Sequence, residues 1–132
     1  MDDTSAPSSA LAFVEAINRR NSETLAALMT EDHAFVDGLG ARIEGRQGVK
    51  AAFDAYFRMV PDYTISIGET FGEGSVVVMI GTAEGTYSAD GRLRPENHWT
   101  TPAAWRVTIC DGLVAEWRVY ADNEPIRQIM RR

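Results

Sequence analysis

Apolar residues recur at helical spacing in three stretches of the first half of the chain. The first stretch predicts a helix that begins at Ser8 and buries Ala10, Phe13, Val14 and Ile17. A second, shorter helix is predicted from Ser22, whose hydroxyl can cap it, and it carries Leu25, Leu28 and Met29. A third carries apolar residues from Val49 to Val60 and ends there, because Pro61 disfavours a helical conformation in the residue before it. Residues 1–7 lack this pattern and are predicted to form a flexible tail.

The second half of the chain alternates with a period of two, which is typical of strands. Two short strands, at residues 34–37 and 41–44, precede it and surround a glycine turn. Four long strands are then predicted at residues 63–71, 75–88, 99–110 and 113–121. Asp111-Gly112 is a two-residue hairpin signal between the last two of them. A short amphipathic segment, residues 126–130, completes the chain.

Helices followed by a meander of long strands predict an α+β fold in one domain, residues 8–132. Three helices from the first half would pack on a strongly curved, mainly antiparallel sheet and form a cone with an internal pocket. Residues 76–80 are apolar at both strand parities, which predicts that the outer face of the sheet is covered as well. We therefore expect a homodimer through that face.

Composition narrows the classes of function. The chain has 132 residues, of which 45% are hydrophobic, and no apolar run approaches the length of a membrane span. A net charge of −6 repels phosphate backbones, so nucleic acid is not an expected partner. The acidic N-terminus has no apolar signal core and predicts a cytoplasmic protein. The one cysteine, Cys110, excludes an internal disulfide, and its place in an alternating strand predicts a buried, inert thiol.

Four segments resemble the SnoaL-like group of the nuclear-transport-factor-two superfamily, also called the cystatin-like fold. They are residues 35–40, 43–46, 111–117 and 120–123, and with the order of elements the resemblance covers nearly the whole chain from residue 8. The group includes polyketide cyclases, ketosteroid isomerase and limonene epoxide hydrolase. The resemblance implies a cone-shaped fold with a small-molecule pocket and no cofactor, but it does not imply one reaction.

Asp37 is the first candidate catalytic residue. It ends a short strand before a glycine turn, and strand alternation places it on the same side as Phe35. The resemblance implies a general base here, because ketosteroid isomerase carries its base at the matching position. A carboxylate in an apolar cavity is poorly solvated and so becomes a better proton acceptor. The alternative is a structural role, in which Asp37 bonds to the backbone of its own turn.

The other catalytic groups of the resembling enzymes are not matched. The positions of the two oxyanion donors of ketosteroid isomerase fall on or near Phe13 and Trp105, and of these only the Trp105 indole N–H can donate a hydrogen bond. Steroid isomerisation by that mechanism is therefore disfavoured. The epoxide hydrolase needs an arginine between two aspartates, but the parity of Arg106 and Arg118 predicts that both face outward.

Asp122 and His98 are the second and third candidates. Asp122 falls where the SnoaL-type cyclases carry an acid used as a base, and those enzymes also use a histidine in a neighbouring strand, for which His98 is the nearest residue. Asp122 could instead cap the segment that follows it. The other histidine, His33, follows two acidic residues and is predicted to be exposed. Two histidines 65 positions apart, without paired cysteines, predict no metal site.

Aromatic residues at helical or alternating spacing belong mostly to a core, although several could line a pocket for a flat, apolar molecule. The predicted pocket-lining residues are Phe13, Tyr56, Trp99, Trp105 and Trp117. Two hypotheses follow. The protein is a cofactor-free isomerase, cyclase or hydratase that uses a carboxylate base on a small apolar or polycyclic molecule. Alternatively, it is a non-catalytic dimeric module of the same fold that binds a small ligand or a partner.

Overall fold

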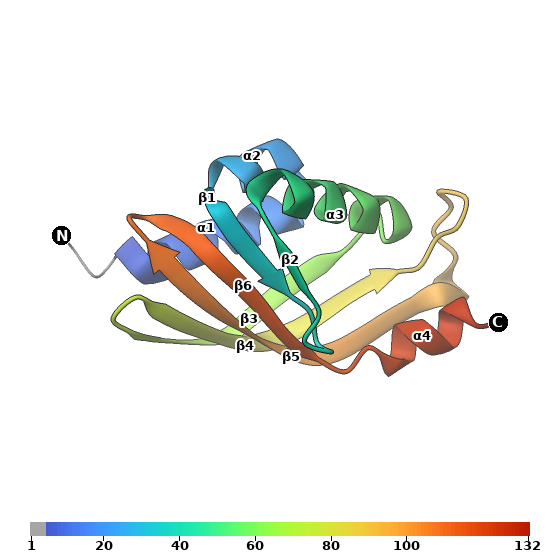
Figure 1. The fold of residues 1–132 in the computed structure, drawn as a ribbon. Coiled ribbons are helices and arrows are strands. Elements are labelled where there is room, and N and C mark those ends of the chain that lie inside the picture. The colour runs from blue at the N-terminus through green and yellow to red at the C-terminus, as the bar shows by residue number, and fades with distance from the viewer. Residues whose placement is uncertain (1–4) are drawn as a thin grey trace.

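Three helices lie on one face of a curled, unclosed sheet in the computed structural model, which describes residues 5–132 (Figure 1). The helices are α1 (Ser5–Asn18), α2 (Ser22–Ala27) and α3 (Arg46–Met59), and a fourth, α4 (Glu124–Met130), lies at the end of the sheet. The strands are β1 (Met29–Val36), β2 (Arg42–Glu44), β3 (Thr64–Glu73), β4 (Val76–Thr86), β5 (His98–Cys110) and β6 (Leu113–Ala121), with a 3₁₀ turn, η1, at Pro95–Asn97. The predicted α+β class and its three helices on a curved sheet are confirmed.

The sheet has the order β2-β1-β6-β5-β4-β3. Strands β3 to β6 form the predicted antiparallel meander, because each pairs with its neighbour in sequence. The hairpin of β1 and β2 joins the last strand of the meander, and β1 runs parallel to β6. This parallel pairing brings the turn after β1 beside the end of β6, although more than 80 residues separate them in sequence.

The boundaries of the first elements differ from the sequence prediction. Helix α1 begins at Ser5, because Pro7 is tolerated in a first helical turn, whereas residues 1–4 of the predicted tail lie outside the described residues. The N-cap of α2 is Asn21, whose side chain accepts a hydrogen bond from the Thr24 N–H, and not Ser22. Met29 belongs to β1, so this strand begins five residues before its predicted start at Ala34.

A β-bulge in β3 reverses the faces of its second half. Ile67 pairs with Gly81 but Glu69 pairs with Ile80, so Gly68 is left out of the register. Ile65 therefore lies in the core, while Phe71 has the opposite orientation and is 56% exposed. Regular alternation along the strand predicted at residues 63–71 places Ile65 and Phe71 on the same face.

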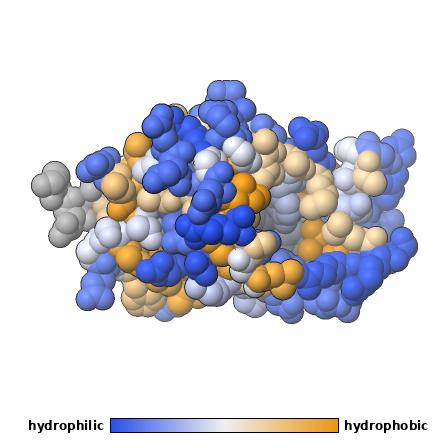
Figure 2. Space-filling view, in the orientation of Figure 1, coloured by the Kyte–Doolittle hydropathy of each residue, from blue (hydrophilic) through white to orange (hydrophobic). Residues whose placement is uncertain are grey.

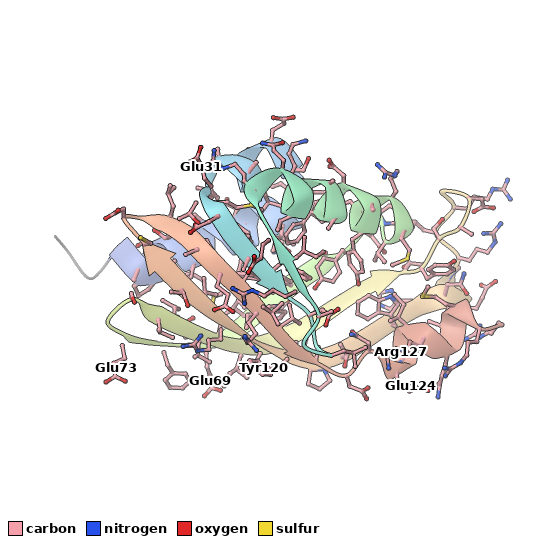
Figure 3. All side chains as sticks on the ribbon, viewed as in Figure 1. Glu31, Glu69, Glu73, Tyr120, Glu124 and Arg127 are labelled. Carbon is pink, nitrogen blue, oxygen red and sulfur yellow. The ribbon has the colours of Figure 1, made fainter. Side chains whose placement is uncertain are left out.

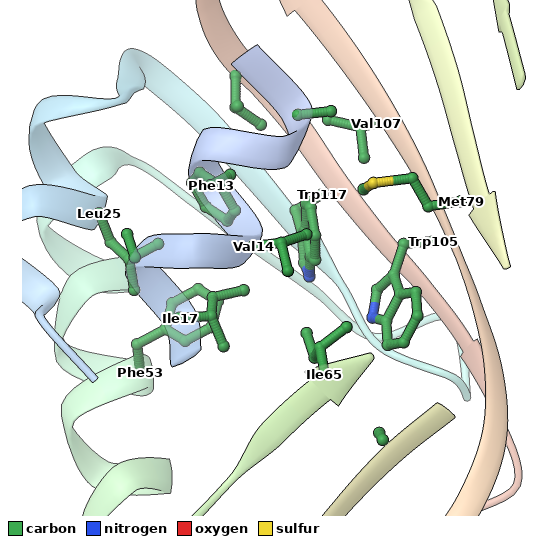
Figure 4. Packing of buried hydrophobic residues seen from close by; sticks show 14 of the residues in the cluster. Phe13, Val14, Ile17, Leu25, Phe53, Ile65, Met79, Trp105, Val107 and Trp117 are labelled. Atoms are coloured by element: carbon green, nitrogen blue, oxygen red, sulfur yellow. The ribbon is translucent and has the colours of Figure 1, made fainter. Parts of the chain in front are cut away.

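The core lies between the helices and the inner face of the sheet. Phe13 of α1 contacts Trp117 of β6, with ring centroids 4.8 Å apart, and Trp105 of β5 lies next to Trp117 (Figure 4). These rings and the aliphatic residues around them form one continuous cluster of buried side chains. The predicted outward orientation of Arg106 and Arg118 agrees with their contacts, since both lie near the Glu116 carboxylate and not in this core.

Two burial predictions are wrong. Cys110 is exposed, because it is the last residue of β5 and its side chain lies on the outer side of the hairpin turn. His33 is completely buried, because β1 begins earlier than predicted and carries it into the core. No helix within residues 5–132 has the length and apolar composition needed to cross a membrane.

Candidate functional site

A cavity of about 290 Å³ lies between the inner face of the sheet and helices α1 and α3. Eighteen residues line it, and seven of them are aromatic: Phe35, Phe53, Tyr56, Tyr63, Trp99, Trp105 and Trp117. Asp37 is the one charged residue among the eighteen. The volume falls at the lower end of the range for small-molecule sites, roughly 300–1,000 Å³. The cavity therefore has room for a small organic molecule and an interior that is mainly apolar.

Asp37 follows the last residue of β1 and contributes to the cavity wall beside Phe35, as strand alternation predicts. Its Oδ1 atom accepts hydrogen bonds from the backbone N–H groups of Leu39 and Ala41, each at 2.9 Å. Oδ2 has no hydrogen bond to any described residue. The turn thus uses one carboxylate oxygen to fix the orientation of the side chain and leaves the other available.

The turn that holds Asp37 is packed against the end of β6. A Cβ atom on Gly38 would lie 3.1 Å from the carbonyl oxygen of Ala121, so a larger residue would push the two segments slightly apart. Val36 pairs with Arg118, so Asp37 is level with Val119, which pairs with Trp105. Asp37 and Trp105 therefore stand two strands apart on the inner face, with Cα atoms about 10 Å apart from the usual strand spacing.

The tryptophans present carbon surface to the cavity. The indole nitrogens of Trp99 and Trp105 are inaccessible to solvent and have no hydrogen-bond partner. Both rings line the cavity, but each indole nitrogen is covered by neighbouring atoms and has no accessible surface there. The Trp105 N–H, which sequence comparison suggested as a donor, is therefore not offered to a molecule in the cavity.

Two tyrosines occupy the end of the cavity near Trp99. The Tyr56 and Tyr63 rings meet edge to face with centroids 5.0 Å apart, and Tyr63 lies 6.1 Å from Trp99. Burial raises the pKa of Tyr56 and of Tyr63 well above its ordinary value, because the phenolate is poorly solvated there. Both side chains are consequently neutral phenols over the physiological range.

The other two candidate acids and bases lie outside the cavity lining. The Asp122 carboxylate accepts a hydrogen bond from the Glu124 N–H at 3.0 Å, one residue before the N-cap of α4, which is Asn123. His98 is exposed, and its Nδ1 atom lies 3.2 Å from the Thr86 hydroxyl, which donates to Asp62. The structure thus does not bring Asp37, His98 and Asp122 together around one molecule in the cavity.

Four of the five predicted pocket-lining residues line the cavity: Tyr56, Trp99, Trp105 and Trp117. The fifth, Phe13, does not, because it is packed behind the wall between Trp117 and His33. His33 donates from Nδ1 to the Val114 carbonyl at 2.7 Å, while its buried Nε2 has no partner. Burial lowers the pKa of His33, so the ring is neutral in the folded protein.

Sequence reasoning missed Thr101 and Asn123, which line the cavity near the end of β6. The Thr101 hydroxyl donates to the Asp122 carbonyl at 3.0 Å and so ties β5 to the segment before α4. The inward parity of Thr101 in β5, which it shares with Trp99, was the available signal. Within residues 5–132, no group of three or more histidine, cysteine, aspartate or glutamate side chains is arranged to hold a metal ion.

Residues 10–117 match the family model of the SnoaL-like domain. Among solved structures, a protein from Shewanella denitrificans OS-217 assigned as a SnoaL-like polyketide cyclase is 17% identical, with a TM-score of 0.82 and 96% of each chain covered. An LEH-like epoxide hydrolase from M. tuberculosis is 18% identical, with a TM-score of 0.79, covering 98% of this chain and 92% of its own. An NTF2-like protein of unknown function from Cytophaga hutchinsonii is 18% identical, with a TM-score of 0.70, covering 92% of this chain and 94% of its own. No curated protein sequence matches the chain. At these identities the structural matches establish a shared fold.

Proposed function

Because this chain belongs to the SnoaL-like domain family, whose fold serves several unrelated reactions, we propose its function from the cavity itself: it binds a small, mainly apolar organic molecule and acts on it with Asp37 as general base. The reaction would be an isomerisation, cyclisation or hydration without a cofactor. The observation that carries this proposal is the unused Oδ2 atom of Asp37 on the wall of an aromatic cavity. A base needs a lone pair that no other group occupies and a fixed orientation, and the Asp37 turn supplies both.

The Asp37→Asn variant tests this role without dismantling the turn. An asparagine side-chain oxygen can still accept from the Leu39 and Ala41 N–H groups, so the fold should persist. Once a screen of cyclic ketones, epoxides and β-keto esters has found a compound that is turned over, D37N should lose turnover by a factor of about 10² or more and keep its affinity. Asp122→Asn is the matched control, because Asp122 lies outside the cavity and an asparagine side-chain oxygen can still accept from the Glu124 N–H. Unchanged turnover in D37N would contradict the base, and a melting temperature lowered with no effect on turnover would assign Asp37 a structural role.

A second candidate is a non-catalytic ligand-binding protein of the same fold. It is favoured by the buried indole nitrogens, because a reaction through an enolate or oxyanion needs donors at the developing charge and the N–H groups of Trp99 and Trp105 have no accessible surface. Failure of every compound in the screen to react, together with binding of some of them, would select this candidate.

We also propose that two copies of the chain associate through the outer face of the sheet. Ile80, Ala104 and Tyr120 form a row across three strands on this face, and Ile80 and Tyr120 are 41% and 53% exposed. Figure 3 shows Tyr120 and Glu69 projecting from the side of the sheet opposite the helices, and Figure 2 shows apolar residues along this lower edge, near the β3–β4 end. Light scattering at micromolar concentration should give twice the monomer mass of 14.6 kDa. Tyr120→Glu should reduce it to the monomer mass, and a monomeric wild-type protein would refute the proposal.

A further inference from the structure

The charge and the aromatic content of the cavity restrict the ligand more than its volume does. None of the eighteen lining residues, all within the described part of the chain, is lysine, arginine or histidine. The one charged group is the Asp37 carboxylate, whose Oδ2 atom has no partner among the described residues. An anionic ligand would therefore meet a like charge and no compensating cation, at a site where water screens charges less than it does at the surface.

The aromatic rings offer a second feature that favours positive charge. The face of a neutral aromatic ring is electron-rich and attracts a cation within about 6 Å of its centre, most strongly for tryptophan. Tyr56 and Tyr63 meet at 89°, and Trp99 lies beside Tyr63, so this end of the cavity has ring surfaces in several orientations. The Trp99 and Trp105 N–H groups, which carry the positive edge of each ring, have no accessible surface in the cavity.

The negative charge of Asp37 and the aromatic ring faces belong to the same cavity, so one cationic group of a ligand can meet both. Asp37 and Trp105 stand two strands apart on either side of Val119, with their Cα atoms about 10 Å apart. Both residues line the same cavity, so an ammonium group bound there would have the Asp37 carboxylate and aromatic ring faces in its wall. We infer that the cavity takes a small organic ammonium compound, in which a methylated or alkylated amine lies against the aromatic wall and is balanced by Asp37.

This inference rests on the ligand-binding part of the proposed function and adds the sign of the ligand's charge. It does not require that Asp37 perform a proton transfer. The carboxylate that attracts the ammonium group can also serve as a base toward the rest of the molecule, and the two roles are measured separately.

The test compares choline with 3,3-dimethylbutan-1-ol, which has the same shape but a carbon atom in place of the charged nitrogen. Binding is followed by ¹H–¹⁵N NMR titration, which detects millimolar affinities and reports the three indole N–H signals of the protein directly. Choline should bind about tenfold or more tightly than the alcohol. Asp37→Asn should remove most of this preference and leave the affinity for the alcohol unchanged, whereas Asp122→Asn should change neither value.

A variant of the aromatic wall provides a separate check. Tyr56→Leu should weaken choline binding several-fold more than alcohol binding, and Tyr56→Phe, which keeps the ring, should retain the preference for choline. Equal affinities for choline and the alcohol in the wild-type protein would overturn the inference but not the binding cavity. Unchanged choline affinity in D37N would overturn it as well. Binding of neither probe would overturn the ligand-binding part of the proposed function together with the inference.

Discussion

The buried imidazole of His33 should make the protein lose stability at mildly acidic pH. The ring is completely buried, stacks on Phe13 with centroids 5.8 Å apart, and donates from Nδ1 to the Val114 carbonyl. Its Nε2 atom has no hydrogen-bond partner, so a second proton would have no acceptor in the core. Burial therefore lowers the pKa of His33 from its ordinary value of 6.5, and the hydrogen bond to Val114 and the nearby carboxylates of Asp32 and Glu116 offset only part of this.

The sign and size of the effect follow from proton linkage. The unfolded chain binds a proton at His33 below about pH 6.5 while the folded protein does not, so falling pH stabilises the unfolded state. This stability is fully present above pH 6.5 and is lost progressively toward the lowered pKa of the folded state. The loss is at most about 1.4 kcal/mol per pH unit, and at most about 2 kcal/mol between pH 7.5 and pH 5.0. Most exposed carboxylates titrate below this window.

Urea denaturation between pH 5.0 and 7.5 measures this dependence. His33→Asn is the informative variant, because an asparagine amide can still donate to the Val114 carbonyl but does not titrate. It should be less stable than wild type at pH 7.5, since the packing on Phe13 is lost, but its free energy of unfolding should fall less toward pH 5.0. His98→Asn, which removes the exposed histidine, should keep the His33 contribution. The same fall in the His33→Asn variant as in wild type would refute the argument.

Three further predictions concern stability: two test contacts with β3, and one tests an exposed position of α3. Gly81→Ala should lower the free energy of unfolding by about 2–3 kcal/mol, because its Cβ would collide with the backbone carbonyl of Ser66. Gly48→Ala should instead raise the free energy of unfolding by about 0.5–1 kcal/mol, because Gly48 is an exposed position of α3 and the nearest side-chain atom would be 3.7 Å from the new Cβ. A loss of stability in this variant would contradict the explanation. Asn18→Ala should lower the free energy of unfolding by about 2–3 kcal/mol, because the Asn18 amide bonds both the N–H and the carbonyl of Ile65, at 2.8 and 2.9 Å, and ties the end of α1 to β3. Urea denaturation at neutral pH checks all three, and an unchanged midpoint for Asn18→Ala would show that water replaces the two bonds without loss.

Local patterning predicted most elements of this fold because they depend on neighbours in sequence. The spacing of apolar residues located α1 and α3, and the Asp111-Gly112 turn located the β5–β6 hairpin, in which both residues adopt positive φ. The inward parity of Trp99, Trp105 and Trp117 also followed from alternation along regular strands. These features need no knowledge of how distant segments pair.

Features that depend on distant pairing were mispredicted. The burial of His33 requires that β1 continue back to Met29 beside β6, and the parallel pairing that allows this joins residues about 80 positions apart. The exposure of Phe71 requires the bulge at Gly68, where a partner strand decides which residue is left out of the register. In the site, by contrast, the sequence placed Asp37 on the correct face beside Phe35, and the alternative it offered, a bond from Asp37 to the backbone of its own turn, is made by Oδ1.

By itself the sequence determined an acidic chain with helices before strands and a carboxylate at the end of a short strand. Hydrophobic periodicity and turn residues were enough to locate these elements, because both signals depend on residues close together in the sequence. Only the tertiary structure decided that Asp37 lies level with Trp105 across Val119, that two indole N–H groups are buried without a partner, and that His98 and Asp122 lie outside the cavity. Strand register and side-chain packing set those relations, and both are properties of segments that meet only in the folded chain.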